Sequence, residues 1–466
     1  MNNLYGKLKN LGLEVPSILI PKTADDPANF IKWPVIACDQ FTQDRAYWEK
    51  VKAAASDAPS THNLIFPEVY LCDTDVSQRI TGIHSAMKKY LKENIFMEAK
   101  KGFIYIERDT SFNVKRRGLI AAVDLEHYDW HPEARPLIRS TEGTVADRLP
   151  PRMDIRRGAP LELPHILLLI DDETDSLLPA LGELAKSGAA DAKPLYSTPL
   201  MMDCGSVTGW FLDTESGRQA EKILSVTAGK LQSLLERSLK RYIKDAKTDG
   251  DSPFLYAVGD GNHSLAAAKG IWQEYRENGG TDMLHPCRYA LAEIENIYDP
   301  AIQFEPIHRL VIGLGFDEII RVLSQLPDFS CRSIDSADGL SAAVCGGLKE
   351  NTRERGPGNV FGVISEGRYA LIETSAHGIA TACLQPLLDS CAAGKNAVID
   401  YIHDEHELFR LSGCSHDIKT AGVLLPPVKK EGLFETVARF GPLPRKSFSM
   451  GHSSEKRFYL ESRALF

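Results

Sequence analysis

Hydrophobic and polar residues alternate along this chain in short apolar runs and in longer stretches with helical spacing. The run 254–258 is apolar and rich in strand-forming residues, and the turn 259–262 that follows contains two glycines. From Ser264 onward, apolar side chains recur at helical spacing as far as Trp272. The pattern predicts a strand, a tight turn and a helix in immediate succession.

Other segments extend this alternation of strands and helices. Residues 166–170 form the most apolar run and should lie centrally in a sheet, with Asp171 and Asp172 at the strand end. Residues 103–108 and 117–123 should pair as a hairpin. We therefore expect an α/β protein of mixed α+β type, with several domains and mixed sheets accompanied by helices.

A chain of 466 residues is expected to form two or three domains. We expect an N-terminal α/β region at 1–130, a central region at 131–312 that holds the candidate site, and a C-terminal α/β region at 313–466. Within the first region, residues 69–71 are expected to form a strand and residues 75–100 an amphipathic helix.

Composition and charge narrow the class of function. The net charge is −9, so no global field attracts nucleic acid or an anionic membrane. No apolar run approaches the ~20 residues of a membrane span. Nine dispersed cysteines without a CxxC pair indicate reduced thiols and a cytoplasmic location. We expect a small-molecule substrate as the partner, no nucleic acid and no membrane, and we leave the oligomeric state open.

The turn before the predicted helix is the segment richest in chemical groups. The first N–H groups and the dipole of a helix favour an anion, and a glycine lets a ligand approach the backbone. Asp260, Gly261, Asn262, His263 and Ser264 place a carboxylate, an amide, an imidazole and a hydroxyl there. The same residue types are common in turns and helix caps, so a purely structural role is the alternative.

A second polar segment covers residues 135–148, with three arginines, two acids and three hydroxyls. Its arginines, Arg148 among them, are suited to bind phosphate, and Glu142 or Asp147 to bind a metal or accept a proton. A surface helix held by ion pairs is the alternative, but the small polar residues before Val145 favour a loop.

Three further places carry candidate ligand-binding residues. Asp39 follows a predicted strand, and its alternative role is to cap the next helix. His308 and Arg309 lie beside another predicted strand, where a lone histidine is more often a satisfied core residue than a catalyst. Lys446 and Ser447 are suited to a phosphate, with a basic surface loop as the alternative.

Several spaced blocks carry a resemblance to a known protein family. The blocks are 32–40, 47–48, 139–148, 259–264, 306–309 and 444–447. Together they resemble the bacterial and archaeal family catalogued as domain of unknown function 1015. The resemblance covers most of the chain and implies a fold, but little established biochemistry.

The central turn is also similar to the phosphate-binding turn of the ParB/sulfiredoxin superfamily, which includes free serine kinases. That resemblance implies a ParB/sulfiredoxin-like central unit in which the turn holds nucleotide phosphate. This chain has Ser264 where that turn usually carries arginine, so the resemblance implies that another cation replaces it. The expected replacement is Lys446, Arg148 or Arg309. Members of the first family tend to be encoded beside serine-biosynthesis enzymes, which implies phosphoryl transfer to an amino acid.

These resemblances and the anion site predict a phosphotransferase acting on a small hydroxyl substrate such as free serine or phosphoserine. Glu142 or Asp260 is expected to serve as base or Mg²⁺ ligand and His263 as acid or base, with a nucleotide or pyrophosphate as donor. The residues expected to bind phosphate or substrate are Gly261, Asn262, Ser264, Arg148, His308, Arg309, Lys446, Ser447 and Asp39. A non-enzymatic sensor of a phosphorylated metabolite, or a phosphatase with the same site, is the alternative.

Overall fold

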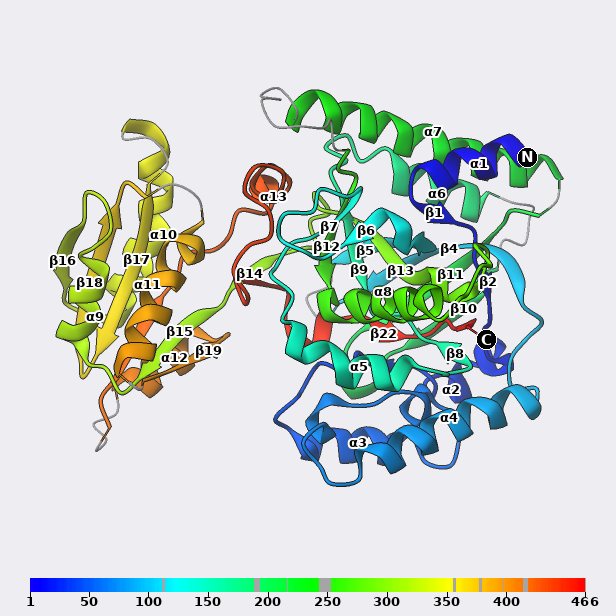
Figure 1. The fold of residues 1–466 in the computed structure, drawn as a ribbon, viewed down its shortest axis with the longest axis horizontal. Helices are drawn as coiled ribbons and strands as arrows, with labels where there is room; N and C mark the ends of the chain where they lie inside the picture. The colour runs from blue at the N-terminus through cyan, green and yellow to red at the C-terminus, as the bar shows by residue number, and fades with distance from the viewer. Residues whose placement is uncertain are drawn as a thin grey trace. The chain divides into compact units, whose positions relative to one another are not determined.

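The computed structural model describes residues 1–110, 114–187, 193–215, 217–242, 253–354, 358–376, 379–395, 397–413 and 418–465. Contacts between residues divide the chain into two compact units (Figure 1). Unit 1 contains Met1–Ile302, Val437–Gly441 and His452–Phe466, and unit 2 contains Gln303–Thr436 and Pro442–Gly451. Strands from 1–130 and from 131–302 share one sheet, so the contacts group these two regions together.

Unit 1 is built on a mixed, twisted sheet of eleven strands among the described residues. In spatial order its main path is β10 (Tyr196–Pro199), β11 (Ser206–Asp213), β4 (Lys100–Asp109), β5 (Lys115–Asp124), β13 (Tyr289–Asn296), β9 (Leu167–Ile170), β12 (Tyr256–Asp260), β7 (Ile138–Ser140) and β6 (Tyr128–Asp129). Two short strands, β1 (Leu13–Glu14) and β2 (Ser17–Ile18), pair with β5 and β4. The expected hairpin is confirmed as β4 and β5, and the apolar strand β9 has neighbours on both sides.

Helices accompany both faces of this sheet (Figure 1). They are α1 (Asn2–Asn10), α2 (Pro27–Phe30), α3 (Arg45–Ala55), α4 (Val76–Lys92), α5 (Leu149–Arg156), α6 (Leu177–Lys186), α7 (Gly217–Tyr242) and α8 (Asn262–Glu277). Successive side chains of a strand point to opposite faces. Phe103 and Tyr105 of β4 accordingly pack in one core with α6, α7 and α8, whereas Ile104 and Ile106 pack in another with α3 and α4.

Strand directions decide which loops meet at one edge of the sheet. β12 runs antiparallel to β9 and parallel to β7. Asp260 at the end of β12 therefore pairs with Leu167 at the start of β9. The residues that precede β9 and those that follow β7 and β12 consequently lie together.

The C-terminal segment of unit 1 returns to the same region through two short pairings. β22 (Phe458–Tyr459) pairs with β3 (Val35–Ile36), and β23 (Arg463–Ala464) pairs with β8 (Leu161–Glu162). Because β22 lies beside β3, the residues just after β3 come close to the C-terminal segment. This pairing joins segments from opposite ends of the chain.

Unit 2 has its own six-stranded sheet among the described residues. Its order is β16 (Ser330–Ile334), β18 (Arg368–Thr374), β17 (Asn359–Ser365), β20 (Thr420–Leu424), β15 (His308–Ile312) and β19 (Val398–Ile402). The accompanying elements are α9 (Phe316–Leu323), α10 (Ala337–Glu354), α11 (Ala380–Lys395), α12 (Glu405–Gly413) and the pair β14 (Phe304–Pro306) and β21 (Phe448–Met450). Phe361 and Val363 of β17 pack with α9 and α11, and Val360 and Ile364 with α10 and α12. The residues of α13 (Leu433–Phe440) are grouped with unit 2 up to Thr436 and with unit 1 from Val437.

Two local predictions are wrong. Residues 69–71 do not form a strand, because Glu68–Tyr70 is a 3-10 helix that begins after Pro67. The helix expected over 75–100 ends at Lys92, and β4 begins at Lys100. Asn94 adopts a left-handed backbone conformation with φ of 55°, which stops the helix before the apolar spacing runs out.

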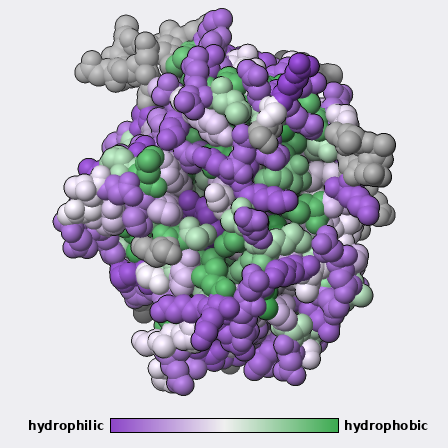
Figure 2. Space-filling view, turned by 90° about the vertical axis from the view of Figure 1, so that its right-hand side faces the viewer, coloured by the Kyte–Doolittle hydropathy of each residue, from purple (hydrophilic) through white to green (hydrophobic). Residues whose placement is uncertain are grey.

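The surface, the helices and the cysteines of the described residues bear on the expectations drawn from composition. On the face drawn in Figure 2, hydrophilic side chains dominate and hydrophobic ones show through in a central band. Among the described helices, none combines the length and apolar character that crossing a membrane requires. Within the described part of the chain, no two cysteines are joined by a disulfide bond.

Candidate functional site

The turn between β12 and α8 is shaped around Gly261. This residue is buried and has a φ of +80°, a conformation that side chains disfavour. A Cβ at this position would lie 3.1 Å from Cα of Ile166. The backbone N–H of Gly261 donates a hydrogen bond of 2.9 Å to Oδ1 of Asp260. A glycine is therefore required for the turn to approach the start of β9 so closely.

The N-terminus of α8 opens at this turn. The helix runs for 16 residues from Asn262, and its N-cap, Gly261, has no side chain to cap the first N–H groups. The side-chain oxygen Oδ1 of Asn262 is buried and has no hydrogen-bond partner within the described residues. The turn thus presents the positive end of a helix, which favours an anion, while the Asn262 oxygen is an acceptor that could take a hydrogen bond from a donor group of a ligand.

Lys456 supplies a cation to the turn. Its ammonium nitrogen Nζ lies 3.1 Å from Oδ2 of Asp260, and its side chain is 8% exposed, against 22% for Asp260. Lys456 was not among the cations predicted to replace the arginine of the turn, and two of those predicted, Lys446 and Arg309, belong to unit 2. Its position in the C-terminal segment beside β22 brings it here.

His165 connects the turn to a second group of polar atoms. Its Nε2 lies 2.9 Å from Oγ of Ser264, and its Nδ1 lies 2.8 Å from the hydroxyl of Tyr459. The Tyr459 hydroxyl in turn donates to Sγ of Cys38 over 3.1 Å. His165 precedes β9, whose pairing with β12 places it beside Gly261. Neither His165 nor Tyr459 was predicted from the sequence as a site residue.

Asp39 lies at the same edge and does not cap a helix. The N-cap of α3 is Asp44, whose Oδ1 accepts from the N–H of Tyr47 over 2.9 Å. The Oδ2 atom of Asp39 lies 3.9 Å from Nε2 of His165, and its Oδ1 accepts from the Gln40 amide. Burial raises the pKa of Asp39, but His165, Gln40 and nearby cations outweigh it, and the net pKa falls below its usual value.

The loop after β7 adjoins the turn. The hydroxyl of Thr141 donates to the carbonyl of Val258 over 2.6 Å. The backbone N–H of Val145 donates to Nε2 of His263 over 3.3 Å, so this ring nitrogen carries no proton. Glu142 lies between these two anchoring contacts and is partly exposed. The loop and the turn therefore form one continuous polar surface.

An arginine–carboxylate pair stands near this surface. Arg148 is exposed, and its carbonyl accepts from the guanidinium of Arg152. Arg152 also forms an ion pair with Glu68. Burial and the charge of Asp39 raise the pKa of Glu68, Arg152 and His165 lower it, and the net pKa lies above the usual value.

A pocket of about 130 Å³ lies beside Ser264. Cys38, His165, Ser264 and Tyr459 all line it, together with the paired residues Glu68 and Arg152. The rest of the lining is mostly apolar and comes from residues 64–66, 155–166 and Met87 among others. The pocket therefore joins a polar relay to an apolar wall, as small-molecule sites commonly do.

Four of the expected site residues belong to unit 2. His308 is buried, its Nδ1 accepts from the N–H of Leu425 over 3.1 Å, and burial lowers its pKa to about 4. Arg309 is fully buried and donates from Nε to Gln385. The contact of His308 matches the alternative of a satisfied core histidine.

The other two unit 2 candidates differ in exposure. Lys446 is exposed and has a φ of 58°. Ser447 is buried, and its hydroxyl donates to the carbonyl of Pro444 over 2.6 Å. The hydroxyl of Thr381 lies 2.9 Å from that of Ser447, which adds a second contact inside unit 2.

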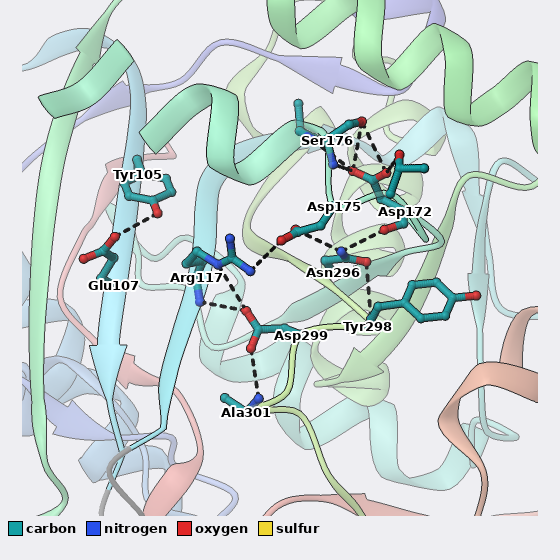
Figure 3. A network of polar contacts seen from close by, with 12 residues as sticks. Tyr105, Glu107, Arg117, Asp172, Asp175, Ser176, Asn296, Tyr298, Asp299 and Ala301 are labelled. Carbon is teal, nitrogen blue, oxygen red and sulfur yellow. Dashed lines mark hydrogen bonds and ion pairs between the residues drawn. The ribbon is translucent and has the colours of Figure 1, made fainter. Parts of the chain in front are cut away.

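The acids at the end of β9 lie away from the candidate site. Because β9 and β12 are antiparallel, Asp171 and Asp172 occupy the opposite edge from Asp260. Asp172 accepts from the backbone N–H groups of Ser176 and Leu177, which caps α6. Figure 3 shows how this cap continues through Asn296, Asp175 and Arg117 to Asp299. The contacts of this cluster satisfy one another, which is typical of a structural network.

Comparisons with known proteins identify the family. A model of the family described as a protein of unknown function, DUF1015, matches residues 19–391. The chain belongs to that family. No match was found among curated proteins.

Three solved structures illustrate what the fold is similar to. A conserved hypothetical protein from Pyrococcus furiosus is 12% identical, with a TM-score of 0.35, over 74% of this chain and 97% of that one. A free serine kinase in complex with AMP is 11% identical, with a TM-score of 0.36, over 73% and 90%. SbnI with a C-terminal truncation, from Staphylococcus aureus, is 10% identical, with a TM-score of 0.32, over 71% and 82%. With TM-scores below 0.5, these likenesses carry no argument about activity.

Proposed function

We propose that unit 1 is a phosphotransferase that binds a phosphorylated small molecule at residues 259–264 and transfers a phosphoryl group to a small hydroxyl substrate such as serine. The observation that supports this is the Lys456–Asp260 pair at the uncapped N-terminus of α8. Helix N–H groups and a lysine neutralise phosphate, and a carboxylate serves a hydroxyl nucleophile or a metal.

Separate groups at the turn would bind the phosphate and accept the proton of the substrate. The N–H groups of Asn262 and His263 and the ammonium of Lys456 would hold phosphate oxygens. The N–H of Gly261, which the sequence analysis also assigned to phosphate, already donates to Asp260. Asp260 or Glu142 would take the proton of the substrate hydroxyl, because both are partly exposed carboxylates at this edge.

The carboxylates at the turn fit a Mg²⁺ site only if phosphate oxygens supply further ligands. Within the described residues, no three His, Cys, Asp or Glu side chains cluster as a metal site. Mg²⁺ in phosphoryl-transfer enzymes is commonly held by one or two carboxylates and by phosphate oxygens. Whichever of Asp260 and Glu142 does not take the proton would hold such an ion, which would neutralise charge on the transferred group. The phosphoryl donor in this proposal is a nucleotide or pyrophosphate.

Ligand stabilisation tests the proposal first. With Mg²⁺ present, we expect ATP, ADP or pyrophosphate at 100 times its Kd to add about 2.7 kcal/mol to the free energy of unfolding. Tryptophan fluorescence reports this for unit 1, because all five tryptophans (33, 48, 130, 210 and 272) lie there. No stabilisation by any of these donors, and no phosphoserine formed from serine, would overturn the proposal.

Substitution separates an enzyme from a sensor that uses the same turn. In the enzyme, Asp260→Asn, Glu142→Gln or His263→Ala abolishes transfer and leaves ligand affinity within a few-fold, while the exposed control Asp57→Asn changes neither. Tight binding without turnover in the unsubstituted protein would favour the sensor. Release of inorganic phosphate from phosphoserine without a donor would favour the phosphatase.

A further inference from the structure

Ser264, His165 and Tyr459 form a continuous hydrogen-bonded relay at the pocket. Ser264 stands in the first turn of α8, where side chains tilt toward the helix N-terminus. Its Oγ lies 2.9 Å from Nε2 of His165, within the distance for a hydroxyl nucleophile and its base. His165 is 8% exposed, so the imidazole is largely shielded from solvent.

The partners of Tyr459 decide which nitrogen of His165 carries the proton. The Tyr459 hydroxyl donates its hydrogen to Sγ of Cys38 and accepts a hydrogen bond from the backbone N–H of Cys38 over 3.3 Å. Its remaining lone pair therefore accepts from Nδ1–H of His165. Nε2 is then the unprotonated nitrogen, and it faces the hydroxyl of Ser264. Burial keeps Tyr459 and the Cys38 thiol neutral, because it raises the pKa of both.

Asp39 completes the arrangement. Its carboxylate is ionised at neutral pH, since its net pKa is lowered, and it lies 3.9 Å from Nε2 of His165. A carboxylate at that distance stabilises the imidazolium that forms when His165 takes a proton. Both ring nitrogens are already engaged, so the hydroxyl that His165 is placed to activate is the protein's own.

We propose that Ser264 is a nucleophile, activated by His165, that carries the phosphoryl group as a covalent intermediate. This inference rests on the proposed phosphotransferase function. In the first step Oγ forms a bond to phosphorus, the bond to the donor's leaving oxygen breaks, and the Oγ proton passes to Nε2. In the second step the substrate hydroxyl attacks the phosphorus, its proton passes to Asp260 or Glu142, and Oγ leaves with the proton held by His165.

The apolar lining of the pocket bears on what reaches Ser264. Residues 64–66 and Met87 offer no charge to a ligand. The charged lining residues are already paired, Glu68 with Arg152 and Glu162 with Arg156. A probe with a short alkyl group and an electrophilic phosphorus matches this lining. A fluorophosphonate with a short alkyl ester is such a probe, because attack by Oγ releases fluoride and leaves a stable phosphonyl-serine.

The experiment is labelling of the full-length chain with that fluorophosphonate, followed by peptide mass analysis. We expect one label, at Ser264, that is absent in Ser264→Ala and unchanged in the exposed control Ser85→Ala. His165→Gln should slow labelling by about 100-fold or more, the size of a general-base contribution. Absence of the label in the folded chain, or an equal rate in His165→Gln, would overturn the inference.

Tyr459 is a positioning residue, and Tyr459→Phe tests it separately. We expect the maximal labelling rate to fall about tenfold, in the range of a lost hydrogen bond, while the half-saturating probe concentration stays the same. Thermal unfolding by tryptophan fluorescence checks that each variant is folded. A fall in labelling that only follows loss of folded protein would contradict the positioning role.

Incubation with the phosphoryl donor distinguishes this inference from the function on which it rests. Donor alone should add the mass of one phosphoryl group at Ser264. Labelling by the fluorophosphonate needs neither donor nor serine, so it would stand even if no transfer were found. Transfer to serine with no phosphorylated Ser264 and no label would support the function and overturn the covalent intermediate.

Discussion

The ammonium nitrogen of Lys456 lies 3.1 Å from Oδ2 of Asp260, although one residue belongs to the C-terminal segment and the other ends β12. Lys456 is the more buried partner, and Asp260 keeps part of its carboxylate exposed. A buried lysine is costly unless it is paired, so Asp260 compensates its charge while the turn is empty. A phosphate bound at the turn would compensate part of the positive charge of Lys456 together with Asp260.

Lys456→Met should weaken pyrophosphate binding by about 10- to 100-fold, because a hydrogen bond to a charged group contributes about 1.5–3 kcal/mol. Titration calorimetry in the presence of Mg²⁺ measures the change. Lys89→Met is the matched control, since the Lys89 side chain is 65% exposed in a helix of the same unit. An unchanged Kd in folded Lys456→Met would exclude Lys456 from the phosphate site.

Local pattern predicted the turn and its flanking elements, but it did not predict all of the residues around it. The strand, glycine turn and helix at 254–277 are each set by neighbours in sequence, and the structure contains them as β12 and α8. His165 and Tyr459 lie in segments with no chemical signature of their own. They reach Ser264 only through the pairings of β9 with β12 and of β22 with β3.

The same limit applies to His308 and to Asp172, because their places in the sequence do not show what they contact. His308 and Arg309 lie next to each other in sequence beside a strand, which resembles a site, but both are buried and bonded inside unit 2. Asp172 ends an apolar strand, yet it caps α6. Residue type and position do not reveal whether a polar group is already satisfied by its own fold.

Arg457→Met should destabilise unit 1 by about 3–5 kcal/mol. Arg457 pairs with Glu293 and Glu461, and the three side chains are at most 2% exposed. Removing the arginine leaves two buried carboxylates without their cation, the costly case for a buried ion pair. Denaturant unfolding followed by tryptophan fluorescence measures the loss.

The control for that substitution is Arg45→Met. Arg45 pairs with Asp73 at a distance of 2.5 Å, but its side chain is 57% exposed. Exposed pairs contribute about 0–1 kcal/mol, so this variant should unfold nearly as the unsubstituted chain does. Equal losses in the two variants would contradict the role of burial.

Asp172→Ala should cost about 2 kcal/mol and leave pyrophosphate affinity unchanged. Its carboxylate accepts from two backbone N–H groups at the start of α6, and the residue is 1% exposed. Denaturant unfolding measures the stability and calorimetry the affinity. A loss of affinity without a loss of stability would show that the network in Figure 3 takes part in binding.

Unit 2 should become less stable as the pH falls from about 6.5 to about 4, because His308 is buried in its neutral form. Burial lowers its folded pKa from 6.5 to about 4, so the unfolded chain binds more protons throughout that interval. The stabilisation is fully present above about pH 6.5, and a shift of this size corresponds to about 3 kcal/mol. Hydrogen exchange of β15, corrected for the intrinsic pH dependence of exchange, measures it.

His308→Asn isolates this effect from other titrating groups. Asparagine keeps an acceptor for the N–H of Leu425 but does not titrate, so the variant should lose less stability than the unsubstituted chain over the same interval. Tryptophan fluorescence of unit 1 should show no such difference between the two proteins, because His308 lies in unit 2. If β15 shows the same pH dependence in both proteins, the acid sensitivity of unit 2 arises from a group other than His308.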